Sequence, residues 1–483
     1  MEPADVAEAV LTMPPKPRLL AAALMLLPAL GAGQTMPPPE HRRLARQIFQ
    51  ELVEINTTRD SGATRAAASM ARRLKNAGFT AADVHLVGPK PHKQNLVVRL
   101  RGRGKGKPIL FLAHLDVVEA LREDWSVDPF KLIEKDGYFY GRGTMDIKNE
   151  AAGLIANLLR LRAEGYVPDR DIILALTDDE EGGEDNGVLW LLEHRPELIE
   201  AEYVINTDAG GGQIENGRRR RNPVQTSEKI YATYQLEVTG AGGHSSLPPK
   251  ENAIYTLAQG LGRLATFDFP KRLNATTRTF FARLSQQDSG QVARDLKAVS
   301  GERPSPEAAR RLTRIPLYNS SMRTTCVATM LQAGHAENAL PQRAQATVQC
   351  RLLPDESPEQ TRTTLMRVLA DSLIQVTLLE EPEPSPASPP SPEVLSAVER
   401  VTRTMWPGVI VLPVMDPWTT DGRHFRAAGT PVYGISGMFY DIADVRAHGK
   451  DERILVQSFY EGVEFMYRLM RDLTGRTGRT GKG

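Results

Sequence analysis

Residues 171–183 read DIILALTDDEEGG, an apolar run that leads into four consecutive acids and two glycines. The run from Ile172 to Thr177 has the length and composition of a strand buried on both faces. Ligands of open α/β sheets bind where such strands end, and the acids stand at that end. Clustered carboxylates raise one another's pKa unless a cation lies nearby. The acids therefore indicate either a cation site or a solvated acidic loop.

Similar apolar runs occur on both sides of this stretch. FLAHLDVV (111–118) and EYVINTDAGGG (202–212) each place polar groups directly after a strand-like core. Helical patterns cover residues 39–56, 64–78 and 147–165. This alternation predicts an α/β fold in which helices flank a central mixed sheet.

Length and composition suggest a globular chain of more than one domain. The chain has 483 residues, a net charge of +1 and 25% charged residues, which excludes wholesale disorder and a polybasic nucleic-acid binder. The pattern changes after Asp208, so we expect one domain from residues 40–222 and 353–473, with an α+β domain inserted at 223–352. We expect Arg218 to Arg221 in a solvated loop, a Pro/Ser-rich loop at 380–392 and a flexible tail at 474–483.

The N-terminus has the order of a secretory signal peptide. Lys16 and Arg18 precede an apolar run from Leu19 to Leu30, and small residues follow it. We expect residues 1–33 to be removed and the protein to be secreted or periplasmic, with an uncleaved membrane anchor as the alternative. Cys326 and Cys350 are the two cysteines, which pair once or stay free.

With so few cysteines, a metal site in this chain has to come from histidines and carboxylates. His114 and Asp116 lie two residues apart at a strand end, so both point to one side. Each signal has an ordinary alternative when taken alone: Asp146 caps a helix, and His448 is an exposed loop histidine. The full candidate set is His114, Asp116, Asp146, Glu180, Glu181, Asp208 and His448.

The order of these motifs is more specific than any one of them. H-x-D, G-R-G-x-x-D, D-E-E-G-G, D-A-G-G-G and a distal A-H-G follow one another, and this order resembles the M20 family of cocatalytic zinc metallopeptidases. That family includes glutamate carboxypeptidase, aminoacylase-1 and carnosinase-type dipeptidases. The resemblance spans residues 40 to 473 and implies an α/β zinc-peptidase domain with an inserted lid and dimerisation domain, built as a four-stranded sheet with two helices.

The resemblance also implies roles for the candidate residues. It places one zinc ion on His114 and Asp208, a second on Glu181 and His448, and Asp146 between them; Co²⁺ or Mn²⁺ would also fit such ligands. It makes Glu180 the general base that acts on a metal-bridged hydroxide, and Asp116 the residue that orients His114. It implies a cis peptide bond after Asp146. Asn149 and Glu150 depart from the family pattern, which has glycine after Asp146-Ile147-Lys148.

Three further residues complete the comparison. His244 resembles the family histidine that polarises the substrate carbonyl, often from the partner subunit of a dimer, and Asn338 and Arg351 match substrate-binding positions. We therefore expect a homodimer that hydrolyses amide bonds in short peptides or N-acyl amino acids, in the manner of a carboxypeptidase. The alternatives are an aminopeptidase or dipeptidase of the same family, or a non-catalytic peptide-binding relative. Asp421 and Arg423, in the C-terminal loop, are expected to be structural.

Overall fold

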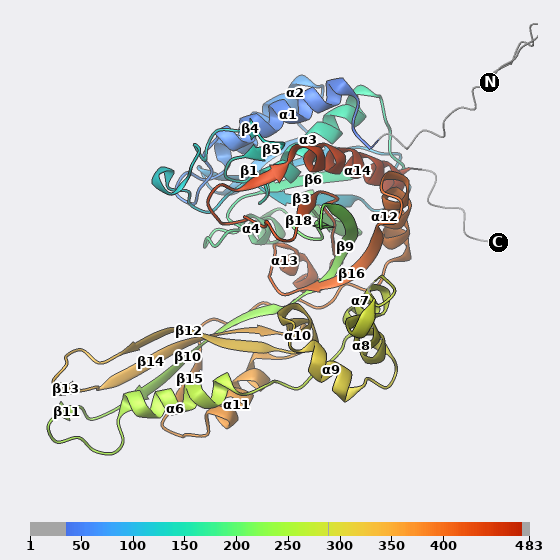
Figure 1. Ribbon diagram of the computed structural model, residues 1–483. Coiled ribbons are helices and arrows are strands. Elements are labelled where there is room, and N and C mark those ends of the chain that lie inside the picture. Colours follow the sequence, from blue (N-terminus) through green and yellow to red (C-terminus); the bar gives the residue numbers. More distant parts are fainter. Residues whose placement is uncertain (1–34, 288, 476–483) are drawn as a thin grey trace, which may run out of the picture. The chain divides into compact units, whose positions relative to one another are not determined.

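Ten strands form the large sheet in the computed structural model, which describes residues 35–287 and 289–475 (Figure 1). In spatial order they are β1 (Val84–Lys90), β2 (Lys93–Leu100), β6 (Ile172–Thr177), β3 (Ile109–His114), β7 (Tyr203–Asn206), β17 (Val432–Gly434), β9 (Arg218–Glu228), β8 (Gly212–Glu215) and β18 (Phe439–Asp441), and β16 (Ile410–Asp416) also pairs with β9. Parallel and antiparallel pairs both occur, so the sheet is mixed, as predicted.

The register of the three central strands decides where the site forms. β3 runs parallel to β6 and β7, with His114 opposite Thr177 and Leu112 opposite Asn206. The residues that follow each strand therefore emerge at one edge of the sheet. This arrangement brings together strand ends that lie about 30 to 90 residues apart in the chain.

Helices cover both faces of the large sheet, which confirms the predicted α/β fold. On one face α1 (Pro39–Glu54), α3 (Lys148–Ala163) and α14 (Val456–Thr474) pack together. α1 buries Ala45, Ile48, Phe49, Leu52 and Val53, the spacing of one apolar helix face. The other helices on the sheet are α2 (Thr64–Asn76), α4 (Gly187–His194), α5 (Pro196–Ile199), α12 (Pro392–Met405) and α13 (Gly422–Ala427).

A second sheet of four strands has its own apolar core. Its spatial order is β12 (Thr325–Ala333), β14 (Arg343–Leu352), β10 (Ile230–Thr239) and β15 (Gln375–Leu378), and α6 (Ala253–Ala265) and α11 (Pro358–Leu369) pack against it. Alternate residues of β10 are buried, as expected for a sheet covered on one face. α11 and β15 come after residue 352, so the segment that builds this sheet runs past the boundary expected from sequence.

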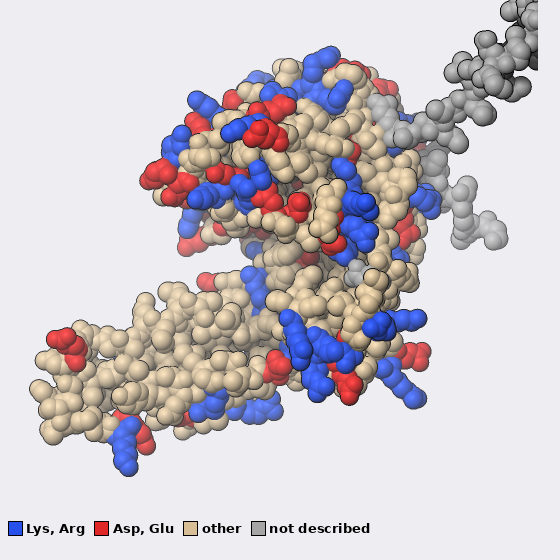
Figure 2. Space-filling view, in the orientation of Figure 1, with Lys and Arg blue, Asp and Glu red and all other residues tan. Residues whose placement is uncertain are grey.

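The segment between α6 and β12 is helical. It contains α7 (Ala275–Leu284), α8 (Gly290–Ser300), α9 (Pro306–Leu312) and α10 (Pro316–Met322), and α7 packs against β16. Lys and Arg side chains gather over this segment, whereas the surface over β12 and β14 carries few charges (Figure 2).

The basic run at 218–221 is not a solvated loop, and that prediction was wrong. These arginines begin β9, where Arg219 forms an ion pair with Glu461 and Arg221 forms one with Glu215. In sequence, a run of like charges looks the same as a solvated face, because nothing in it shows which acids pair with it. Glu215 lies close by in the chain, but Glu461 lies far away.

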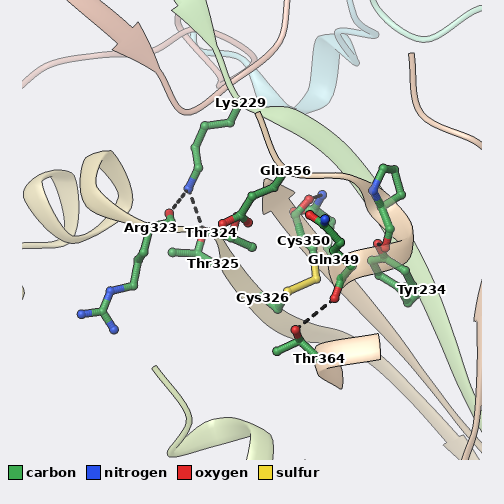
Figure 3. Close-up of a disulfide and its surroundings, with 12 residues drawn as sticks. Lys229, Tyr234, Arg323, Thr324, Thr325, Cys326, Gln349, Cys350, Glu356 and Thr364 are labelled. Carbon is green, nitrogen blue, oxygen red and sulfur yellow. Dashed lines mark hydrogen bonds between the residues drawn. A yellow bond between two sulfur atoms is a disulfide. The ribbon is translucent and has the colours of Figure 1, made fainter. Parts of the chain in front are cut away.

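One disulfide joins the second sheet internally. Cys326 and Cys350 stand opposite each other on β12 and β14 and are bonded (Figure 3). Beside them, Lys229 Nζ donates to the Arg323 carbonyl at 2.8 Å and to Thr325 Oγ1 at 3.3 Å. The disulfide decides between the two states that the sequence left open.

No helix among residues 35–287 and 289–475 is long and apolar enough to cross a membrane. The expected signal peptide at 1–33 and most of the expected tail at 474–483 lie outside the described residues.

Candidate metal centre

His114 is the buried end of the central strand β3, and carboxylates face both of its ring nitrogens. Its Nε2 lies 3.2 Å from Asp146 Oδ1 and 3.8 Å from Asp208 Oδ1. Its Nδ1 lies 3.0 Å from the carbonyl oxygen of Asp116 and 3.6 Å from the Asp116 carboxylate. The shorter of these two contacts, to the backbone carbonyl of Asp116, orients the ring.

Asp146 also faces the second histidine. His448 Nε2 lies 3.1 Å from Asp146 Oδ2 and 3.0 Å from Glu181 Oε2. The two oxygens of Asp146 thus face His114 on one side and His448 on the other. Asp146 thus lies between two histidines that are about 300 positions apart in the chain, where a carboxylate could face two metal ions.

Two acids of the loop after β6 make structural contacts, and the other two face the candidate site. Asp178 accepts the Ala63 backbone N–H at 2.7 Å, and Asp179 pairs with the buried Lys93 at 2.6 Å. Glu180 and Glu181 face the site instead: Glu180, His114 and Asp208 place one ligand atom each within 4.8 Å of one another, and so do His114, Asp146 and Glu181. The solvated-loop alternative does not describe these acids.

The shifted pKa values of these side chains indicate an excess of negative charge in the candidate metal centre. Burial disfavours the charged imidazole of His114, but hydrogen bonds to Asp116, Asp146 and Asp208 raise its pKa well above the usual value. Hydrogen bonds to Asp146 and Glu181 raise the pKa of His448 to about 10. Burial raises the pKa of Asp208 to about 7, and burial and Asp208 raise that of Glu180. Nitrogen and carboxylate donors crowded in this way fit divalent cations, which bind the deprotonated forms.

The loop that carries Asp146 is held by a residue that the sequence analysis did not single out. Asp146 does not cap the following helix, because α3 begins at Lys148 without a side-chain cap. Instead the peptide bond between Asp146 and Ile147 is cis, as the resemblance implies, and the buried carboxylate of Glu452 accepts backbone N–H groups of this loop. The available signal was an acid four residues after His448, which a single sequence does not distinguish from a surface charge.

A cavity of about 1590 Å³ opens beside these residues. Arg351 from β14 lines it, together with Tyr231 from β10, and the guanidinium carbon of Arg351 stands 4.6 Å from the Tyr231 ring centre. His244 and Asn338 do not line the cavity. In the short pair β11 (Gly243–His244) and β13 (Ala339–Leu340), His244 stands opposite Ala339, and the Asn338 carbonyl accepts the Ser245 backbone N–H at 3.1 Å. The predicted site residues in the lining are Asp146, Glu180, Glu181, Asp208, Arg351 and His448.

Residues that depart from the family pattern also reach the cavity. Asn149 and Glu150 line it from the first turn of α3, and Ser436 donates a hydrogen bond to Glu150. Burial raises the pKa of Glu150 to about 8. Neither residue displaces one of the predicted ligands.

Of the two residues expected to be structural in the C-terminal loop, Asp421 is held by buried hydrogen bonds, whereas Arg423 lines the cavity and donates from Nη1 to the Thr420 carbonyl at 3.2 Å. Asp421 is buried and accepts hydrogen bonds from Asn186 Nδ2 at 2.6 Å and Thr177 Oγ1 at 3.2 Å. Asp421 thereby fastens the end of the acidic loop. His424 is also buried and pairs with Glu383 of the Pro/Ser-rich loop.

The fold and the candidate metal centre are those expected of a metallohydrolase, and comparison with known proteins specifies the family. The family model described as peptidase family M20/M25/M40 matches residues 110–472. The chain belongs to this family of metallopeptidases and amidohydrolases.

Individual relatives agree with this assignment. The human N-fatty-acyl-amino acid synthase/hydrolase PM20D1 is 31% identical over 389 residues, which cover 76% of this chain and 74% of the relative. The M20 metallo-carboxypeptidase Sso-CP2 of Sulfolobus solfataricus has a similar fold, with a TM-score of 0.66, 17% identity and coverage of 89% and 99% of the two chains. The Bacillus subtilis protein YXEP, a dinuclear metal-binding peptidase, aligns with a TM-score of 0.57, 12% identity and coverage of 89% and 98%.

Proposed function

We propose that this protein hydrolyses amide bonds that lie next to a free carboxylate, in N-acyl amino acids or short peptides. The observation that carries this proposal is Arg351. Its Nη1 is buried and has no hydrogen-bond partner among the described residues, although the side chain lines the cavity beside the metal centre. Burial lowers the pKa of Arg351, and Arg423 adds to this effect. A guanidinium whose buried Nη1 has no partner is suited to a carboxylate, which would accept the missing hydrogen bond.

Five residues would hold two metal ions. His114 and Asp208 would bind one, Glu181 and His448 the other, and Asp146 both. Zinc suits the set, and Co²⁺ or Mn²⁺ suits it too. Such ions polarise a carbonyl and lower the pKa of water.

Glu180 is the proposed general base. It precedes the ligand Glu181, lines the cavity and lies within the His114 and Asp208 cluster. Its carboxylate would take a proton from the attacking water and deliver it to the leaving nitrogen. Asp116 would be a positioning residue. Its backbone carbonyl contacts His114, and its carboxylate accepts the Glu181 backbone N–H at 3.0 Å.

The cavity walls favour substrates with an apolar group. Tyr231, Leu379, Trp418 and Val445 line the cavity, and each is between 48% and 51% exposed. Covering such side chains contributes about 25 cal/mol per Å² of apolar surface. A substrate with an aliphatic acyl chain would cover them, in keeping with the name of the human relative, N-fatty-acyl-amino acid synthase/hydrolase.

A dipeptidase or aminopeptidase activity is the second candidate. Glu380 and Glu381 line the same cavity from the Pro/Ser-rich loop, and both are exposed. A free amine would find a complementary charge there.

We further propose that the second sheet is a lid and dimerisation domain. β12 is an edge strand, and its Val327, Met330 and Leu331 are 57–64% exposed. An exposed apolar edge is a surface for pairing with a second copy. A homodimer through this edge would let His244 and Asn338 of one copy complete the site of the other.

Export is part of the proposal. The Cys326–Cys350 disulfide is typical of oxidising compartments, and it supports a secreted or periplasmic location for the mature protein.

A matched substrate set tests the proposed activity. Zinc-loaded protein is offered each N-acyl amino acid and dipeptide with a free and with an amidated C-terminus, and each dipeptide with a free and with an acetylated N-terminus. We expect cleavage of the free-carboxylate members and preference for aliphatic acyl groups, measured by mass spectrometry. Cleavage that ignores amidation but needs a free amine would favour the second candidate. No cleavage with any metal would favour a peptide-binding relative.

A further inference from the structure

Glu452 lies where two distant parts of the metal centre meet. It directly precedes β19 (Arg453–Leu455), which pairs with β5 (Tyr138–Tyr140), and β5 pairs with β4 (Ile133–Lys135). Its backbone carbonyl accepts the Gly141 N–H at 3.1 Å. This small sheet therefore sets the segment after His448 beside the segment that leads to Asp146.

The side chain of Glu452 is completely buried and fully engaged. Its Oε1 accepts the backbone N–H groups of Met145 at 2.6 Å and Asp146 at 3.0 Å. Its Oε2 accepts the Gly143 N–H at 3.2 Å and Arg142 Nη1 at 2.6 Å. All four partners are donors, so the ionised carboxylate satisfies this geometry and a protonated carboxyl would not. Burial raises the pKa of Glu452, and the Arg142 guanidinium opposes that effect.

Arg142 is itself held in place. Its guanidinium carbon stands 5.0 Å from the Trp125 ring centre, and Nη2 donates to the Glu119 carbonyl at 3.2 Å. The pair of Glu452 and Arg142 is a buried polar unit whose loss would leave several donors unsatisfied.

The position of Glu452 in the chain connects the Glu452–Arg142 pair with two of the proposed metal ligands. Glu452 stands four residues after His448, whose side chain is more than half exposed and therefore gains little support from packing. The donors that Glu452 accepts belong to the loop that presents Asp146. We propose that Glu452 is a positioning residue that holds the Asp146 loop and the His448 segment at the separation that metal binding requires. This inference rests on the proposed metal binding and concerns a residue without any assigned role.

Glu452→Gln tests the inference with little change of shape. The amide nitrogen would face backbone N–H groups instead of accepting from them, so the Asp146 loop would lose part of its support. Zinc dissociation constants of the metal-free protein are measured by competition with a chelator. We expect the variant to bind zinc about 10- to 100-fold more weakly, as is usual when a partner of the ligands is removed.

Glu464→Gln is the matched control. Glu464 is also buried and accepts from Arg160 Nη1 at 2.8 Å, but it lies on α14 and contacts none of the proposed ligands. We expect both variants to lower the unfolding temperature of the metal-free protein, and Glu452→Gln alone to weaken zinc binding. Glu452→Asp, which keeps the charge but shortens the side chain, is expected to fall between Glu452→Gln and the wild type.

The outcomes are distinct. Wild-type zinc affinity in Glu452→Gln, with only a loss of thermal stability equal to that of the control, would overturn the inference. If the wild type itself bound no divalent metal, the proposed function would fail, and the inference with it. Two zinc sites in the wild type and weakened sites in Glu452→Gln alone would support both.

Discussion

The two groups of predicted site residues differ in how the fold holds them. His114, Asp146, Glu181 and Asp208 follow strands or tight loops of the large sheet and converge within a few ångströms of one another. His244 lies in the separate two-stranded sheet of β11 and β13, and Asn338 directly precedes β13; both are exposed, and neither lines the cavity. Parallel strands bring their ends to one edge within a single chain, whereas the tip of an exposed hairpin needs a partner to cover it. The first group is assembled within one chain, whereas the second group would join it only in the proposed homodimer.

The largest effect on hydrolysis is expected from a substitution in the candidate metal centre at the edge of the large sheet. Glu180→Gln keeps the shape of the side chain but removes the proposed base, so we expect hydrolysis to fall by at least about 10²-fold. Metal content, measured by elemental analysis, is expected to stay at the wild-type level. The control is Glu193→Gln, an exposed acid of α4 that does not line the cavity, with a change of about twofold or less. Near-wild-type hydrolysis by Glu180→Gln would show that another group is the base.

Arg351 connects the second sheet to the cavity, and its loss ranks next. Arg351→Ala removes a charged hydrogen-bonding partner of the substrate carboxylate, so we expect kcat/KM to fall about 10- to 100-fold, mainly through KM. Amidated substrates should show little change. Arg343→Ala, at an exposed position of the same strand, is the control. An equal loss for free and amidated substrates would refute carboxylate recognition by Arg351.

The proposed division of the site between two copies can be tested by complementation. In a mixture of His244→Ala and Glu180→Gln proteins, each mixed dimer would hold one intact site. Random exchange should then restore about a quarter of wild-type activity. Leu331→Lys places a charge on the exposed edge of β12 and is expected to yield monomers and prevent recovery, as measured by light scattering and activity. Full activity in a monomeric Leu331→Lys protein would show that one copy forms a complete site without His244 and Asn338 of a partner.

A smaller effect concerns the junction between the two sheets. Burial lowers the pKa of Lys229 from 10.5 to about 7, and Glu356 acts in the opposite direction. Between pH 7 and 10.5 the unfolded chain therefore binds up to one more proton than the folded one, so the free energy of unfolding rises with pH there. The slope is at most about 1.4 kcal/mol per pH unit.

Lys229→Met should abolish this part of the pH dependence, as measured by denaturant unfolding at several pH values. The Arg323 carbonyl would lose its donor, so the variant is expected to be less stable above pH 10. A slope that is the same in both proteins would mean that Lys229 stays charged in the folded state.

How far the sequence predicts the site depends on whether a residue's role is local. The acids after Thr177 and Asp208 follow apolar strands, and that pattern alone indicates the edge where they stand. Asp179 carries the same signal as Glu181, yet its partner is the buried Lys93. The difference between a salt-bridged acid and a proposed ligand is set by the direction of one loop, and no local pattern encodes that direction.

The sequence by itself determined the α/β class, the order of the motifs and the family to which they belong, because strand and helix periodicity and short motifs are local properties. Only the tertiary structure decided that the arginines at 218–221 form a strand, that Cys326 and Cys350 are bonded, and that Glu452 supports the Asp146 loop. Each of these depends on a partner far away in the chain. Packing and hydrogen bonding in the folded state bring each residue next to its partner, although the two lie apart in the sequence.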